Sequence, residues 1–279
     1  MNNDEIRKQQ REAWNKFSAG WKKHDSFVTR WLQPVGDKLL DVIQLREGYV
    51  VLDAATGTGE PGLSAAKRVG KGKVVGCDVA TDMVSIAEEK AQTGGIYNYQ
   101  GKVCDESSLP FPDNYFDAVV CRFGIMFFPN MAMGVKELAR VLKPGRKISM
   151  SAWAEPYKNP LIITPTRIIN QMLSLPPPAS DAPGPFRCSA CGTLSTLLKQ
   201  GGFHSINEVD VSGEVVFDSP SHYWEFVTEV LSAVATPMAK VDDDQRKKVK
   251  RAVVDAIQTY EKQSKISLPW TSWIASGVK

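Results

Sequence analysis

The sequence has only three histidines, and its charges nearly cancel. Lys and Arg number 34 against 31 Asp and Glu, which leaves a net charge of +3. A chain without a strong excess of positive charge is not typical of proteins that bind nucleic acids or anionic membranes. No apolar run reaches the roughly 20 residues of a transmembrane helix, and the first ten residues lack the apolar core of a secretory signal. We therefore expect a cytoplasmic protein with no nucleic-acid partner and no membrane insertion.

Cysteine is also scarce, and its spacing argues against a metal centre. The five cysteines are Cys77, Cys104, Cys121, Cys188 and Cys191. The first three lie in or beside predicted strands, where a free cysteine is a small buried apolar residue. Cys188 and Cys191 form the one C-x-x-C pair, but a structural zinc site needs four ligands, and only His204 lies nearby. We expect no metal site, and the sequence leaves open whether this pair has any role.

The stretch that organises the chain is Val50–Gly62. Its apolar start predicts a buried strand, a glycine-rich turn follows, and residues 63–69 predict a helix. Gly57, Gly59 and Gly62 have the G-x-G-x-x-G spacing of a turn that brings a nucleotide against the backbone. Strand, glycine turn and helix make the first unit of a nucleotide-binding α/β fold, but the glycines alone do not say which nucleotide binds.

Three acidic residues at strand ends narrow the choice of ligand. Asp53 ends the first strand and would repel a pyrophosphate, whereas it would attract the ammonium and sulfonium of S-adenosylmethionine (SAM). In the alternative interpretation Asp53 only caps the turn backbone. Asp78 ends the second strand, where it can accept both ribose hydroxyls of either NAD or SAM. Asp105 follows the third strand and can accept from an adenine amino group.

Alternating strands and helices predict a parallel sheet covered on both faces. Strands are expected at 50–53, 73–78, 96–100, 116–121, 147–153, 205–217 and 266–278. Helices are expected at 4–33, 34–45, 63–69, 82–87, 131–142, 160–174, 193–200, 220–235 and 242–262. The helix at 34 is predicted from Pro34, which suits a first helical position.

Several of these motifs together resemble the class I SAM-dependent methyltransferases. They are Asp53-x-Ala55-x-Gly57-x-Gly59, Asp78, Cys104-Asp105, the Leu-Pro-Phe-Pro-Asp-Asn-x-Phe-Asp segment at 109–117 and Arg140-Val-Leu-Lys-Pro-Gly145. The segment from Cys121 to Asn130 is similar to the branch with ubiquinone/menaquinone-type C-methyltransferases and many small-molecule methyltransferases. Ala55 departs from the usual glycine, and Arg146 replaces the second glycine of the usual Lys-Pro-Gly-Gly turn.

The resemblance implies a doubly wound, mostly parallel, seven-stranded sheet whose last strand is antiparallel. It implies SAM across the ends of the first four strands, with the glycine turn at its amino-acid part and Arg122 lining the methionyl end through its backbone. The cofactor residues expected on this basis are Asp53, Ala55, Thr56, Gly57, Gly59, Asp78, Val79, Met83, Asp105, Glu106 and Arg122.

The remaining sequence predicts what surrounds this core. We expect a helical lid at 1–46, the SAM-binding core at 47–157, and helical cap additions with the last strands at 158–279, all in one globular unit. An aromatic stripe in the first helix and aromatic residues after the fourth and fifth strands predict an apolar acceptor pocket. The residues expected to line it are Trp14, Trp21, His24, Phe123, Phe127, Trp153 and Tyr157.

The chemistry itself stays less defined than the cofactor. In-line transfer from a sulfonium needs alignment, and a base only for some acceptors, for which His24, His222, Glu155 and Tyr157 are candidates without a distinguishing pattern. We therefore expect methyl transfer to carbon, oxygen or nitrogen of a small, partly hydrophobic or aromatic acceptor, in a protein that can form a homodimer. The alternatives are an NAD-dependent oxidoreductase and a SAM-binding regulatory protein without turnover.

Overall fold

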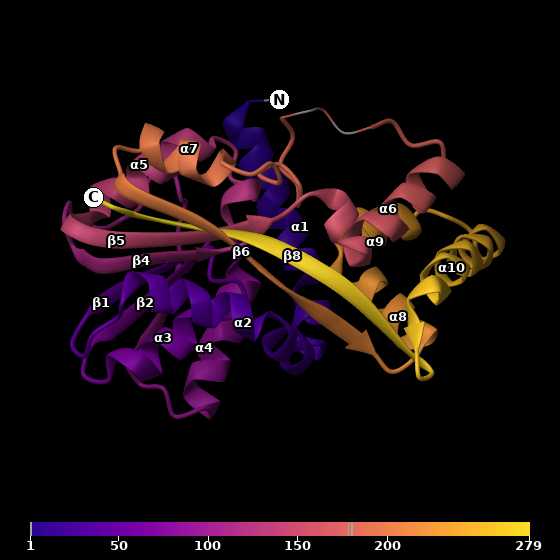
Figure 1. The fold of residues 1–279 in the computed structure, drawn as a ribbon, viewed down its shortest axis with the longest axis horizontal. Coiled ribbons are helices and arrows are strands. Elements are labelled where there is room, and N and C mark those ends of the chain that lie inside the picture. Colours follow the sequence, from indigo (N-terminus) through magenta and orange to yellow (C-terminus); the bar gives the residue numbers. More distant parts are fainter. Residues whose placement is uncertain (1, 178, 180) are drawn as a thin grey trace.

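The computed structural model describes residues 2–177, 179 and 181–279, and it contains one mixed β-sheet flanked by helices (Figure 1). Seven strands follow one another in the order β3-β2-β1-β4-β5-β8-β6, and a short β7 pairs with β8 beside this path. The strands are β1 Val50–Ala54, β2 Lys73–Asp78, β3 Tyr99–Val103, β4 Phe116–Arg122, β5 Leu142–Trp153, β6 His204–Phe217, β7 Glu261–Lys262 and β8 Lys265–Val278. Strands β1 to β5 pair in parallel, whereas β8 runs antiparallel to β5 and β6. The predicted fold class is confirmed.

Alternating side chains of the central strands point into two separate hydrophobic layers. On one face Val51 and Val74 pack with Leu40 and Leu63, which come from α2 and α3. On the other face the neighbouring residues of the same strands join a larger core. The helices are α1 Asn3–Lys23, α2 Asp25–Ile43, α3 Gly62–Val69, α4 Thr81–Thr93, α5 Met131–Val141, α6 Pro160–Met172, α7 Thr193–Gln200, α8 Pro220–Val230, α9 Ser232–Met238 and α10 Asp243–Ile257. This two-residue alternation is what a sheet covered on both faces requires.

Strands β6 and β8 are much longer than the strands at the centre of the sheet. Each spans 14 residues, and together they run from β5 out to the group formed by α6, α8, α9 and α10 (Figure 1). Buried residues at the far end of this strand pair, such as Phe217 and Ile266, belong to the same hydrophobic cluster as Leu52 of β1. The cap helices are therefore tied to the sheet by a continuous core.

The N-terminal helices break at a different residue from the one predicted. The predicted boundary at Pro34 is wrong, because Pro34 lies inside α2, and the chain turns at His24 instead. His24 is both the C-cap of α1 and the N-cap of α2. Its N–H donates to the Gly20 carbonyl, and its carbonyl accepts from the Val28 N–H. Helix α2 continues through Pro34 because Leu32 and Val35 on either side are buried against the core.

Other element boundaries also shift. The third strand covers 99–103 rather than 96–100, and β5 begins at Leu142, five residues before its predicted start at 147. The predicted helix at 220–235 is two helices that meet at Leu231, and the helix predicted to reach residue 262 ends at Ile257. Boundaries of this kind depend on tertiary packing and are the least reliable part of sequence-based reasoning.

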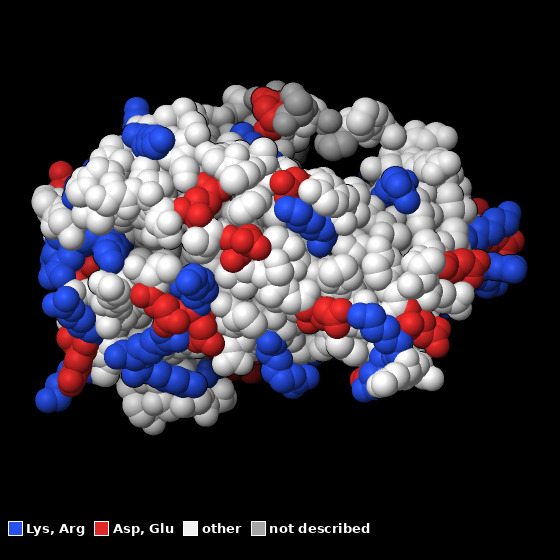
Figure 2. Space-filling model, in the orientation of Figure 1, with Lys and Arg blue, Asp and Glu red and all other residues white. Residues whose placement is uncertain are grey.

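The charged residues on the face shown in Figure 2 are mixed in sign, with Lys and Arg interspersed among Asp and Glu. Across the described residues, charged side chains form ion pairs between elements, such as Arg68 with Asp37 and Asp41, and Lys262 with Glu214. Within the described residues, no helix is long and apolar enough to span a bilayer.

Candidate functional site

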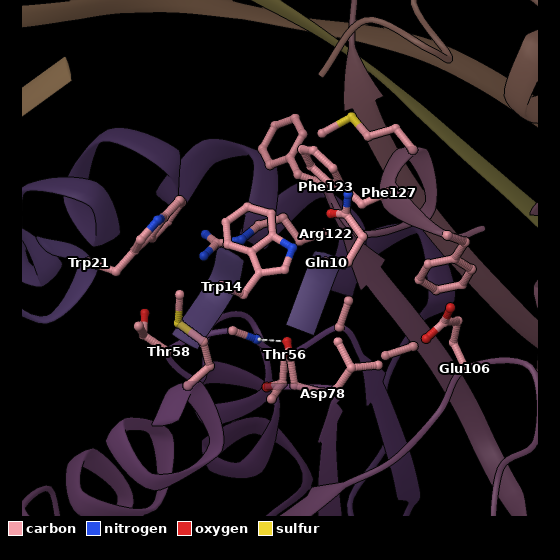
Figure 3. A pocket seen from close by; sticks show the side chains of 18 of the residues that line it. Gln10, Trp14, Trp21, Thr56, Thr58, Asp78, Glu106, Arg122, Phe123 and Phe127 are labelled. Carbon is pink, nitrogen blue, oxygen red and sulfur yellow. Dashed lines mark hydrogen bonds between the residues drawn. The ribbon is translucent and has the colours of Figure 1, made fainter. Parts of the chain in front are cut away.

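A large cavity opens at the edge of the sheet where β1, β2 and β4 end (Figure 3). It encloses about 1530 Å³ of empty space when its open mouth is counted. Its wall is formed by the loop after β1, the ends of β2 and β4, the segment 104–109, helices α1 and α2, and the junction of α8 and α9. Ligands of open α/β sheets bind outside the carboxyl ends of the strands, so this cavity lies where the sequence predicts the cofactor.

Asp53 holds the glycine turn from behind and does not line the cavity. Its Oδ2 accepts from the Thr56 hydroxyl at 2.6 Å and from the Gly62 N–H at 2.9 Å. A side chain at Gly62 would place its Cβ 2.6 Å from this same oxygen, so only glycine fits there. Burial raises the pKa of Asp53 to about 7, partly offset by the Thr56 hydrogen bond and by the nearby charge of Arg122. The turn is thus fixed by a fully buried carboxyl.

Asp78 lies on the cavity side of the same turn and joins it to β2. Its Oδ2 accepts from the Gly57 N–H at 2.9 Å and its Oδ1 from the Ala80 N–H at 3.0 Å. Burial raises the pKa of this carboxyl, and the backbone hydrogen bonds work in the opposite direction. Val79 and Met83 follow it along the cavity wall. A carboxylate with free lone pairs beside an apolar wall suits a ribose and a flat base.

Asp105, which sequence reasoning places at an adenine, is already engaged by the N-terminal helix. Its Oδ2 lies 2.7 Å from Arg7 Nε, and its Oδ1 accepts from the backbone and hydroxyl of Ser107. Asp105 does not line the cavity, whereas the next residue, Glu106, does. Burial raises the pKa of Glu106 to about 7.

Aromatic residues from three parts of the chain form the apolar end of the cavity. Trp14 packs edge-on against Trp21 and Phe127, with ring centroids 6.1 and 5.1 Å apart. In a second group, Trp153 is stacked on both Trp31 and Phe123, with ring centroids 5.7 and 4.1 Å apart. All six rings line the cavity. The indole N–H groups of Trp21 and Trp31 are buried and have no acceptor among the described residues.

Arg122 brings an unpaired charge to this cavity. Its guanidinium lines the wall and makes no hydrogen bond or ion pair with any residue that the structure describes. The guanidinium lies near Gly36 of α2 and near the start of α3. A Cβ built on Gly36 would be 3.9 Å from Nη1 of Arg122 and 3.6 Å from the Cβ of Pro61. Figure 3 shows this side chain behind the indole of Trp14. Burial lowers the pKa of Arg122, and Glu60, Asp53 and Asp25 oppose that effect.

The structure places most of the predicted site residues in one cavity. Those that line it are Ala55, Thr56, Gly57, Asp78, Val79, Met83, Glu106, Arg122, Trp14, Trp21, Phe123, Phe127 and Trp153. Asp53, Gly59 and Asp105 lie behind or beside the wall instead. Residues that sequence reasoning missed include Arg7 and Gln10 of α1, Trp31 and Leu231. Only Trp31 carried a signal, because it belongs to the aromatic stripe.

His24 and Tyr157 do not line the cavity, so their predicted place in the acceptor pocket is corrected. His24 is buried against Phe226, and its Nε2 lies 2.8 Å from Glu229 Oε2. Tyr157 is 75% exposed on the surface. Neither of the other base candidates lines the cavity: His222 packs on Phe27 and Phe217, and Glu155 pairs with Lys158.

One group of metal-ligand type is present among the described residues, outside the cavity. It consists of His24, Glu225 and Glu229. The ammonium of Lys23 lies 2.5 Å from Glu225 and 2.8 Å from Glu229, so the two carboxylates already have a cationic partner. This arrangement is an ion-pair network that joins α1 to α8.

Residues 51–145 match the protein family described as "Methyltransferase domain". A ubiquinone/menaquinone biosynthesis C-methyltransferase UbiE from Cronobacter sakazakii is 30% identical over 191 residues, which cover 63% of this chain and 75% of that protein. The enzyme of the same name from Chromobacterium violaceum is 38% identical over 115 residues, or 41% of this chain and 47% of that protein. The demethylmenaquinone methyltransferase of Bacillus subtilis is 32% identical over 121 residues, 43% of this chain and 52% of that protein. The chain thus spans between about half and three quarters of these relatives.

Solved structures share the fold at lower identity. The YcgJ protein from Bacillus subtilis has a TM-score of 0.58 at 20% identity, and the match covers 88% of this chain and 97% of that one. A phosphoethanolamine N-methyltransferase 2 from Haemonchus contortus, in complex with phosphomonomethylethanolamine and S-adenosylhomocysteine, has a TM-score of 0.54 at 18% identity, over 88% of this chain and 52% of that one.

Proposed function

Because the chain belongs to the class I SAM-dependent methyltransferases of the ubiquinone/menaquinone type, we propose that its cavity aligns SAM with a small aromatic, quinone-like acceptor for methyl transfer. SAM is the cofactor of this family, and the enzyme class follows from membership. The acceptor, the atom methylated and the residues that hold each ligand are parts of the proposal. One observation carries it: a single cavity combines a nucleoside-type groove with an apolar aromatic end.

The chain's own polar groups fit SAM along one wall. We assign the ribose hydroxyls to Asp78, whose oxygens accept from the backbone N–H groups of Gly57 and Ala80 and have further lone pairs to offer. Val79 and Met83 offer an apolar surface to the adenine, with Glu106 at its edge. The amino-acid part then lies at the turn of residues 55–57. When bound, SAM supplies the electrophilic methyl group.

Arg122 supports this direction of binding. Its guanidinium lies beside Gly36 and the start of α3, at the glycine-turn end of the groove, and no described residue neutralises it by contact. An unpaired buried charge is costly, whereas a charge that a ligand carboxylate completes is favourable. We therefore assign the side chain of Arg122 to the carboxylate of the methionyl part.

The aromatic end fits an acceptor that has a flat ring and oxygen atoms. Trp153 stacks on Trp31 and Phe123, and Trp14 and Trp21 pack edge-on in the lining of the same cavity. The buried indole N–H groups of Trp21 and Trp31 have no acceptor among the described residues, and such donors are usually satisfied by a ligand or water. A hydroquinone or phenol can offer both the ring face and the oxygen atoms. The names of the relatives, quinone-biosynthesis C-methyltransferases, favour carbon as the atom methylated.

The chain's contribution to the reaction is alignment and exclusion of water. Proximity and orientation can lower a barrier by roughly 7–11 kcal/mol when two reactants are well placed. Helix α1 covers the site, since Arg7 pairs with Asp105 and Asn15 accepts from the Asp82 N–H at 3.1 Å. None of the four base candidates from the sequence reaches the cavity.

The proposal is tested by incubating the protein with SAM labelled in its methyl group and a panel of acceptors. The panel contains a naphthohydroquinone, a simple phenol and an aromatic amine of similar size. We expect label in the hydroquinone, with mass spectrometry and NMR placing the new methyl group on a ring carbon. If only the amine becomes labelled, the acceptor is an amine and the proposed hydroquinone class is wrong. Binding of SAM without transfer to any acceptor would favour the regulatory alternative.

A further inference from the structure

Two thiols face each other in the wall of the cofactor cavity. Cys77 lies near the end of β2 and Cys104 directly follows β3, and their sulfur atoms are 2.7 Å apart. Both side chains line the cavity, although only 3% and 7% of each residue is exposed. The parallel pairing of the strands fixes this approach, because the Cys104 N–H donates to the carbonyl of Asp78 at 2.9 Å.

The other three cysteines are not placed in this way. Cys121 is buried in the sheet and is not part of the cavity wall, and Cys188 contacts the sulfur of Met131 at 3.4 Å. Cys191 is exposed. A disulfide needs its sulfur atoms about 2.05 Å apart, so the sulfurs of Cys77 and Cys104, now 2.7 Å apart, must come closer by less than an ångström.

The surroundings of the pair give its two thiols different reactivity. The hydrogen bond from Cys77 lowers the pKa of the Cys104 thiol, and the positive charge of Lys102 acts in the same direction. The same contact and burial raise the pKa of the Cys77 thiol. Since the thiolate is the reactive form, Cys104 is the nucleophile of the pair and Cys77 is placed to attack it after oxidation.

We propose that Cys77 and Cys104 form a reversible disulfide when a small peroxide enters the cavity in the absence of cofactor, and that this oxidation and cofactor binding exclude each other. In the first step the Cys104 thiolate attacks one oxygen of hydrogen peroxide. An S–O bond forms, the O–O bond breaks, and the leaving hydroxide takes up a proton to become water. In the second step the sulfur of Cys77 attacks the sulfenic sulfur, and the second oxygen leaves as water with the thiol proton. Two thiols are oxidised by two electrons, and one peroxide is reduced to two waters.

The mutual exclusion follows from the position of the pair. Cys77 immediately precedes Asp78, and Cys104 is two residues from Glu106, on the part of the wall that we assign to the nucleoside. A ligand there covers both sulfurs. A covalent link would in turn draw the end of β2 toward segment 104–106 and narrow the groove between Val79 and Glu106. This part of the inference rests on the proposed function.

The test treats a Cys191→Ser protein with hydrogen peroxide, so that the exposed thiol cannot link two molecules. Peptide mapping by mass spectrometry follows the cross-link between Cys77 and Cys104 with and without saturating S-adenosylhomocysteine (SAH). We expect an intramolecular cross-link that dithiothreitol reverses and that forms at least tenfold more slowly with SAH present. The oxidised protein should bind SAH at least tenfold more weakly, with full recovery after reduction.

Three variants serve as controls for the assignment. Cys77→Ala and Cys104→Ala should each abolish the cross-link, whereas Cys121→Ala should retain it, with circular dichroism melts showing that all three are folded. Peroxide that yields sulfinic acid or no cross-link in folded protein would overturn the proposal. So would equal rates with and without bound SAH, or equal SAH affinity before and after oxidation. If the reduced protein does not bind SAH at all, the assignment of the cavity to the cofactor is wrong. The cross-linking measurement then still decides whether Cys77 and Cys104 form a reversible disulfide.

Discussion

Replacing Arg122 by Gln tests whether its side chain recognises the carboxylate of the cofactor. The substitution keeps a polar side chain of similar reach but removes the charge. A hydrogen bond to a charged group contributes about 1.5–3 kcal/mol, and 1.4 kcal/mol is tenfold in affinity. We therefore expect SAH to bind the variant roughly 10- to 100-fold more weakly than the wild type.

The informative comparison uses a ligand that lacks the group in question. 5′-Methylthioadenosine has the nucleoside and the sulfur but no amino-acid part, so its affinity should change by less than about twofold if the loss is confined to one charged contact. Calorimetric titration of both ligands against both proteins gives a complete cycle. Arg68→Gln is the matched control, because Arg68 pairs with Asp37 and Asp41 away from the cavity. Equal loss for both ligands would refute the assignment, since Arg122 would then act through the fold. If the variant loses affinity for the acceptor alone, Arg122 belongs to the acceptor site and not to the cofactor site.

Three further predictions concern the turn and the strand ends. Asp78→Ala should weaken SAH binding by about 1.5–3 kcal/mol, which calorimetry measures directly. Because burial raises the pKa of Asp53 to about 7, the folded protein holds a proton that the unfolded chain releases above about pH 4. Ionisation of this group therefore lowers the free energy of unfolding as pH rises from 4 to 7, by at most about 4 kcal/mol. In thermal melts, the melting temperature of Asp53→Asn relative to the wild type should rise between pH 5 and pH 8. Ala55 has a φ of 56°, which is strained for a residue with a Cβ. Ala55→Gly should therefore stabilise the protein by about 0.5–1 kcal/mol in urea titrations, because the strain relieved exceeds the entropy that glycine adds to the unfolded chain. A fall in stability would mean that the packing of the alanine methyl contributes more than its strain costs.

The parts of the site that sequence reasoning placed well depend on local chemistry. Residues 50–62 show apolar strand, glycine turn and helix within one short stretch, and Asp78 ends the next strand. Parallel pairing then brings these ends to one edge whatever the rest of the chain does. The Gly57 turn and Asp78 meet there, at 2.9 Å.

The residues that sequence reasoning misplaced depend on distant partners. Asp105 follows the third strand as expected, but its carboxylate pairs with Arg7, which lies almost a hundred positions earlier in the chain. His24 shares the helical spacing of Trp14 and Trp21, yet helix α1 ends just before His24, and the imidazole ring lies against Glu229 of α8. Periodicity along one helix carries no information about either partner. The same holds for the α8–α9 junction at Leu231, which closes the cavity.

Parallel calorimetric titrations of the wild-type protein with SAH and with NAD decide whether this cavity binds SAM or a dinucleotide. We expect one SAH site per chain with roughly micromolar affinity, near −8 kcal/mol, and no heat of binding with NAD. If NAD binds and SAH does not, the cavity is a dinucleotide site, and the assignment of Arg122 to the methionyl carboxylate is wrong.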